Sequence, residues 1–154
     1  MTWTLLPATA FAAHAERWQA LNAATAASPL LERDFVEPLL TEFGTGKELL
    51  ASYERGGETL AMAIVTPRGR GAWETFQPSQ APIGLWLQRP GLESGALLDA
   101  LLRKLPGFPL VLALTQADPA LAPRPAAAGA LTTLDYVATS KITLAGTFED
   151  YWNS

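Results

Sequence analysis

The stretch Gln88 to Gly95, "QRPGLESG", joins an apolar, strand-like run to a leucine-rich run with helical spacing. At such a junction, free backbone N–H groups and the dipole of the following helix favour an anion such as a pyrophosphate. Gly91 and Gly95 would let the backbone approach that anion closely, and Gln88 and Ser94 lie beside them. The alternative is a turn that needs glycine only for its shape, and spacing alone favours this alternative.

A second stretch with ligand-binding potential is "TFQPSQAPIGLWL", residues 75–87. Its two prolines stop the preceding strand from pairing further. Gln77 directly precedes the first proline, Ser79 and Gln80 lie between the two prolines, and Trp86 follows. Polar groups in an aromatic setting can orient a sugar or an amide ligand. The alternative is a rigid connector whose polar groups bond to the backbone, and the sequence supports both readings equally.

The sequence lacks the residues or motifs that several common catalytic and binding sites require. The chain has no cysteine and a single histidine, His14, so we expect no thiolate nucleophile and no metal site. No serine lies in a Gly-x-Ser-x-Gly motif, which a serine hydrolase of the α/β type would need. The run "FGTGKE" at 43–48 lacks the first glycine and the final Ser or Thr of a phosphate loop, which favours a helix stop followed by a strand.

Composition excludes further classes of function. The chain has 154 residues, enough for one domain, and a formal net charge of -4. A mildly acidic domain lacks the basic surface that a phosphate backbone requires, so we expect no nucleic-acid partner. No apolar run approaches the roughly 20 residues of a membrane span. The lack of cysteine favours an intracellular, cytoplasmic location over a secreted one.

The first third of the chain predicts a short strand at 2–6 and two helices. The first helix carries one apolar stripe, made of Phe11, Ala15, Trp18 and Leu21. In the second, Asp34 and Glu37 have the spacing of a capping box, and Gly44 marks the stop. Its apolar face is expected to consist of Phe35, Leu39 and Phe43.

The middle of the chain predicts antiparallel strands. A strand at 47–55 and a strand at 58–66 are joined by a Gly56-Gly57 hairpin. The second of these is apolar on both faces, which predicts a central position in a sheet. A third strand, at 72–77, leads into the proline-containing stretch.

Beyond residue 90, the clearest expected element is a helix with leucines on one face. These are Leu97, Leu98, Leu101, Leu102 and Leu105. The apolar run at 109–116 predicts a strand buried on both faces, and the period-two run at 131–144 predicts another strand. Thr147 and Asp150 would cap a last helix that stops in its second turn. We therefore expect the chain to be the N-terminal part of a longer polypeptide.

This order of elements resembles the acetyltransferase fold of the GNAT superfamily. The resemblance implies one α/β (α+β) domain over 1–154, with a mixed, mostly antiparallel central sheet flanked by helices. In that family the turn after the fourth strand binds the pyrophosphate of acyl-CoA, with the pattern Gln or Arg, two residues, Gly, one residue, Gly or Ala. Gln88 and Gly91 match this pattern, but Glu93 occupies its last position, and a carboxylate there repels a pyrophosphate.

A closer resemblance is to bacterial proteins with two such domains in tandem, the FemAB-like and cellulose-biosynthesis-associated acetyltransferases. It rests on the Trp18-to-Leu21 helix, the Phe43-Gly44 helix end, the stretch at 75–86, the Asp118-Pro119 turn and the Tyr151-Trp152 helix. It implies a second GNAT-like domain, C-terminal to this one, that carries the acyl-CoA site.

The resemblance also implies roles for individual residues. Acetyl-CoA would be a co-substrate rather than a tightly bound cofactor, held at Gln88, Gly91, Ser94 and Gly95. The acceptor, a small amine or sugar, would bind near the strand splay beside Gln77, Ser79, Gln80 and Trp86. If this half has chemistry of its own, Glu74 would be the base and Tyr136 the acid in direct acyl transfer to an amine.

A different class of function competes with this one. Glu93 at the anion turn favours a non-catalytic binding module that recognises a polysaccharide or a protein partner. In either case, a chain whose second half is missing could also pair with itself as a homodimer to bury the face left open.

Overall fold

The strand β3 (Glu58–Gly69) has other strands on both of its edges, and it is apolar on both faces because each face packs into a core on its own side of the sheet. Every residue from Leu60 to Val65 is buried. One edge pairs with β2 (Leu49–Arg55), and the other pairs in turn with β4 (Ala72–Thr75) and β5 (Trp86–Gln88). The central position expected for this strand is confirmed.

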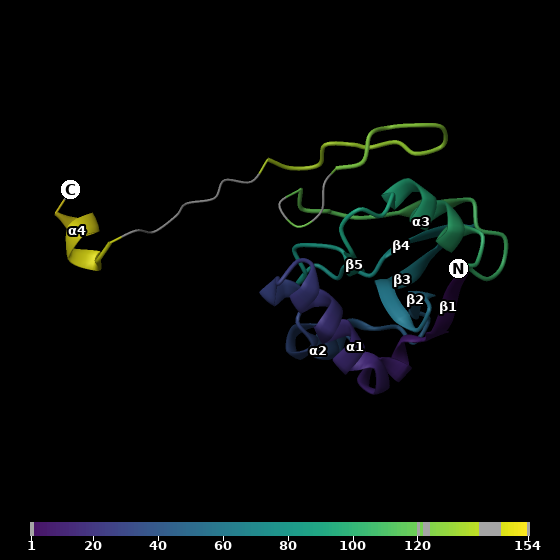
Figure 1. Cartoon of the computed structure of the whole chain (residues 1–154), viewed down its shortest axis with the longest axis horizontal. Helices are drawn as coiled ribbons and strands as arrows, with labels where there is room; N and C mark the ends of the chain where they lie inside the picture. Colours follow the sequence, from purple (N-terminus) through teal and green to yellow (C-terminus); the bar gives the residue numbers. More distant parts are fainter. Residues whose placement is uncertain (1, 120, 122–123, 139–145, 154) are drawn as a thin grey trace.

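The structure, a computed structural model, describes residues 2–119, 121, 124–138 and 146–153 (Figure 1). Within them the strand order is β1–β2–β3–β4–β6, with β5 paired to β3. The outer strands are β1 (Thr2–Pro7), antiparallel to β2, and β6 (Val111–Ala113), which runs parallel to β4. The sheet is therefore mostly antiparallel, with one parallel pair at one edge.

Helices cover both faces of the sheet (Figure 1). On one face lie α1 (Phe11–Ala24) and α2 (Arg33–Phe43). On the other lies α3 (Ser94–Leu102). No helix of the described residues is long and apolar enough to cross a membrane. The expected fold class, a mixed and mostly antiparallel sheet between helices, is confirmed at this level.

Several local predictions are confirmed. The expected stripe of α1 is buried in full, at Phe11, Ala15, Trp18 and Leu21. The leucines of α3 and of the turn after it are buried at positions 97, 98, 101 and 105. Gly56 and Gly57 form the hairpin with φ of +58° and +83°, and glycine adopts such values without the steric cost of a side chain.

The predicted start of α2 is wrong, and its predicted face is right only in part. The N-cap is Glu32, without a side-chain capping bond, and Asp34 lies inside the first turn. The buried side chains of the helix are Val36 and Leu39, whereas Phe43 is 41% exposed. Of the expected face, Leu39 is buried and Phe35 packs half-buried against the same core, whereas Phe43 does not.

The expected burial of the 109–116 run is also wrong. It forms only the three-residue β6, at the edge of the sheet, where Leu110 and Val111 are 61% and 58% exposed. A continuous apolar run is typical of a central strand, but in the described chain no strand pairs with the outer edge of β6.

The predictions for the last part of the chain have mixed outcomes. The described residues 132–138 form no strand, and residues 139–145 of the expected strand lie outside the described ranges. The last helix is confirmed as α4 (Phe148–Trp152), which begins directly after Thr147.

Candidate functional site

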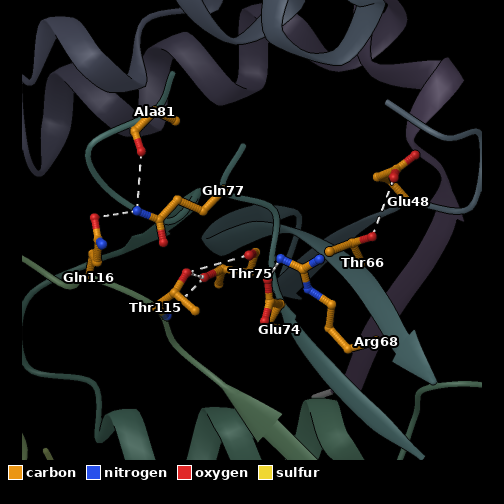
Figure 2. A network of polar contacts seen from close by, with 9 residues as sticks. All are labelled: Glu48, Thr66, Arg68, Glu74, Thr75, Gln77, Ala81, Thr115 and Gln116. Atoms are coloured by element: carbon orange, nitrogen blue, oxygen red, sulfur yellow. Dashed lines mark hydrogen bonds and ion pairs between the residues drawn. The ribbon is translucent and has the colours of Figure 1, made fainter. Parts of the chain in front are cut away.

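A polar junction joins β4 to the chain that follows β6 (Figure 2). Thr75, the last residue of β4, is fully buried. Its hydroxyl accepts a hydrogen bond from the Thr115 N–H (3.0 Å) and shares a second one with the Thr115 hydroxyl (2.7 Å). The Gly84 N–H donates to the Thr115 carbonyl (3.1 Å). The end of β4, the loop that follows it and the chain after β6 are therefore held at one point.

Gly84 fits this junction because it has no side chain. A Cβ at this position would overlap the Thr75 hydroxyl and lie 2.6 Å from the Thr115 carbonyl oxygen. Real Cβ atoms do not approach other atoms so closely. Sequence analysis did not single out Thr75, Gly84 or Thr115, and small residues in an apolar stretch give no signal by which to find them.

The loop between β4 and β5 uses part of its polar chemistry to hold its own shape. The Gln77 amide nitrogen donates to the Ala81 carbonyl (3.1 Å) and to the side-chain oxygen of Gln116 (Figure 2). The Ser79 hydroxyl donates to the side chain of Gln80 at 2.9 Å, in an exposed position. Of the expected acceptor-binding residues, Gln77 is thus committed to internal bonds, while Ser79 and Gln80 face solvent.

Trp86 lies on the opposite side of the sheet from α1 and α2, in the core beneath α3. It is only 7% exposed and its ring packs against Trp3 at a centroid distance of 5.7 Å. Its indole N–H donates to the side-chain oxygen of Gln88 (2.9 Å). This placement separates Trp86 from the polar loop with which sequence proximity had grouped it.

The turn from β5 to α3 is braced by the Gln88 side chain. Its oxygen also accepts from the Ser94 hydroxyl (3.1 Å), and its nitrogen donates to the Leu92 carbonyl (3.2 Å). Gly91 has φ of +81°, which the tight turn requires. The structure therefore brings together Gln88, Gly91 and Ser94, three of the residues expected to bind the cofactor.

The start of α3 carries two features that bear on anion binding. Glu93 is the N-cap residue, and its side chain makes no capping bond. A methyl of Leu131 lies 3.3 Å from where a Gly95 Cβ would be, so this side chain lies over the first turn. The helix start thus combines a carboxylate with an apolar cover, and both disfavour an anion.

Glu74 forms an ion pair across the hairpin with Arg68, at 2.6 Å (Figure 2). The hydrogen bond and the charge of Glu74 raise the pKa of the Arg68 guanidinium above its ordinary value. Tyr136 is 79% exposed in a segment without regular structure. Within the described residues, no hydrogen bond or ion pair joins these two expected catalytic residues.

Glu48 is a buried charged residue that sequence analysis missed, with an exposed fraction of 3%. Its carboxylate accepts from the Thr45 N–H (3.0 Å), the Thr45 hydroxyl (2.8 Å) and the Thr66 hydroxyl (3.3 Å). Burial raises its pKa, but the bonds from the Thr45 N–H and hydroxyl, with those from Gly46 and its own backbone, lower the pKa overall. The Thr-x-x-Glu spacing was the available signal.

Glu48 also lines an open hollow of about 390 Å³ between the start of α1 and the end of α2. Glu37 and Thr41 contribute polar groups to the same wall. This hollow is distinct from the β5–α3 turn where sequence analysis expected a cofactor. No group of three or more His, Cys, Asp or Glu side chains in the described ranges is arranged to hold a metal ion.

No family model matches the chain, and no curated protein or solved structure is significantly similar to it. Any functional inference for this chain therefore rests on the geometry of the junction and of the β5–α3 turn.

The close packing at Gly84 predicts a large effect of a single methyl group. We expect Gly84→Ala to lower the free energy of unfolding by about 3 kcal/mol, because the methyl overlaps backbone as well as side-chain atoms. Chemical denaturation followed by tryptophan fluorescence measures the change. Gly95→Ala is the matched control, because its methyl meets only a flexible leucine and alanine favours a helix. Equal stabilities of the two variants would contradict the close packing.

The Glu48 carboxylate should make a pH-dependent contribution to the free energy of unfolding. Its pKa is lowered in the folded chain, so its contribution is present above the ordinary carboxyl pKa and is lost as the pH falls through the lowered value. We expect Glu48→Gln to cost about 1–3 kcal/mol at neutral pH, because an amide nitrogen then faces N–H donors. This difference from the unmodified chain should shrink in acid, as urea denaturation across a pH series will measure. Glu42→Gln, at an exposed position, should show neither effect. A cost of Glu48→Gln that does not change with pH would contradict a stabilising role of the charged Glu48 carboxylate.

Proposed function

We propose that the chain is the non-catalytic N-terminal half of a tandem GNAT-like acyltransferase, and that it shapes the cleft for the acceptor. The succession of elements supports this proposal. Antiparallel β2, β3 and β4 lead to β5, a glycine turn and α3, and then to β6, which pairs in parallel with β4. The junction between β4 and β6 is then the counterpart of the strand splay of that family.

The closure of this junction is the observation that carries the proposal. A ligand that separates two strands needs unpaired backbone and open space between them. Here Thr115 bonds directly to both Thr75 and Gly84, and even a methyl group at Gly84 would not fit. The geometry thus favours a closed contact between β4 and the chain after β6 over an opening that the thioester of acyl-CoA could enter.

The β5–α3 turn supports the same conclusion. In an acyl-CoA site the backbone N–H groups of this turn would face a pyrophosphate, and a nearby carboxylate would repel it. Glu93 is placed at the helix start, and Leu131 lies over the first turn. The Gln88 side chain bonds within the turn itself. A second domain would therefore have to supply the acyl-CoA site.

The remaining catalytic expectation is also consistent with an inactive half. In direct acyl transfer a base removes a proton from the acceptor amine as its nitrogen attacks the thioester carbonyl, and the thiolate of CoA leaves. Glu74 would be that base, but it is ion-paired with Arg68. Its carboxylate is therefore already engaged within the β3–β4 hairpin.

A non-catalytic binding module for a protein partner is the second candidate. It is favoured by apolar side chains that lie exposed near β6, namely Phe108, Leu110 and Val111, with exposed fractions of 81%, 61% and 58%. Apolar groups gathered at one edge are typical of protein interaction sites.

Calorimetric titration with acetyl-CoA tests the proposed function. We expect no binding heat for the unmodified chain. Glu93→Ala restores the family pattern at that position and removes the repelling charge, but we expect it too to bind no acetyl-CoA, because the junction remains closed. Glu42→Ala controls for the loss of one negative charge. Micromolar binding by the unmodified chain would contradict the proposal and favour an active domain.

A further inference from the structure

The outer edge of β6 is apolar and open in the described chain. Leu110 and Val111 are more than half exposed, and Phe108 nearby is 81% exposed. A strand at the edge of a sheet presents N–H and C=O groups that can pair with another strand. Natural proteins usually protect such edges with charged side chains, especially lysine. No Asp, Glu, Lys or Arg occurs between Lys104 and Asp118, so this edge lacks that protection.

The opposite edge of the sheet differs. β1 presents the exposed polar side chains Thr2 and Thr4, while its apolar Trp3 is buried beneath α3. The exposed apolar edge is therefore a property of β6 and not of both outer strands.

The charge pattern around β6 fits a second copy of this chain. At its start, the Leu110 N–H donates to the Gly71 carbonyl (2.7 Å), which places the hairpin containing Arg70 at this end. Asp118 follows the turn beyond its other end. Two copies of β6 that pair antiparallel place the start of each beside the end of the other. Arg70 of one copy then lies toward Asp118 of the other, and the uncharged middle meets itself without repulsion.

We propose that β6 pairs antiparallel with β6 of a second copy, which makes a two-fold symmetric dimer with one continuous sheet. Leu110 and Val111 supply the apolar contact of this interface. A two-fold axis makes the interface isologous, so that one self-complementary edge suffices. The proposed dimer does not depend on the proposed function. Acetyl-CoA titration tests the function and the oligomeric state tests the dimer, so either can fail without the other.

Cysteine cross-linking tests this dimer directly. The chain has no cysteine of its own, so a single introduced thiol can form a disulfide only with a second copy. Bridging requires Cα atoms roughly 4.4–6.8 Å apart. We expect Leu110→Cys, Val111→Cys or Ala113→Cys to form a disulfide dimer under mild oxidation, and the position with the highest yield locates the axis. Val137→Cys, with an exposed fraction of 67% in another segment, is the matched control and should give no disulfide-linked dimer.

Light scattering gives an independent measurement without oxidation. We expect the unmodified chain to be a dimer and Val111→Lys to be a monomer that still unfolds cooperatively, because a lysine at the edge blocks strand pairing without disturbing the core. Val137→Lys should remain a dimer. A monomeric unmodified chain, or cross-linking as efficient at position 137 as along β6, would overturn the proposal.

Discussion

The buried hydroxyl of Thr75 determines how the β4 side of the sheet is completed. It receives the Thr115 N–H and pairs with the Thr115 hydroxyl, while the Thr115 carbonyl receives the Gly84 N–H. These bonds fix the chain after β6 against the end of β4 and draw in the loop that leads to β5. Because a buried polar group without a partner is costly, the three segments cannot separate independently.

The closed junction between β4 and β6 also bears on the function of the chain. The parallel pair of β4 and β6, followed along the chain by no further strand in the described residues, lies where a ligand could enter between strands. Hydrogen bonds occupy that place instead. The turn before α3 is likewise occupied by its own Gln88 side chain. Both features support the proposal that the domain shapes a neighbouring site and does not perform the chemistry itself.

The features that could be predicted from the sequence are those that depend on hydrophobic periodicity and on the residues of tight turns. The α1 stripe from Phe11 to Leu21 and the Gly56-Gly57 hairpin follow from local rules, and both are confirmed. The β6 run was misjudged because an apolar sequence does not reveal whether another strand lies beside it. The face of α2 was predicted correctly at Leu39 but not at Val36 or Phe43, because local spacing does not show where the helix ends relative to the core. Thr75 and Thr115 were missed because their partnership exists only in the folded chain.

Amide hydrogen exchange measured by NMR tests the central claim, the closed junction between β4 and β6, most directly. The Gly84 and Thr115 N–H groups are the two backbone donors of the junction. If the junction is closed as described, both should exchange as slowly as the Ile64 N–H of the central strand, which bonds to the Leu85 carbonyl. Fast exchange of Gly84 and Thr115 beside a protected Ile64 would show an open junction and contradict the account.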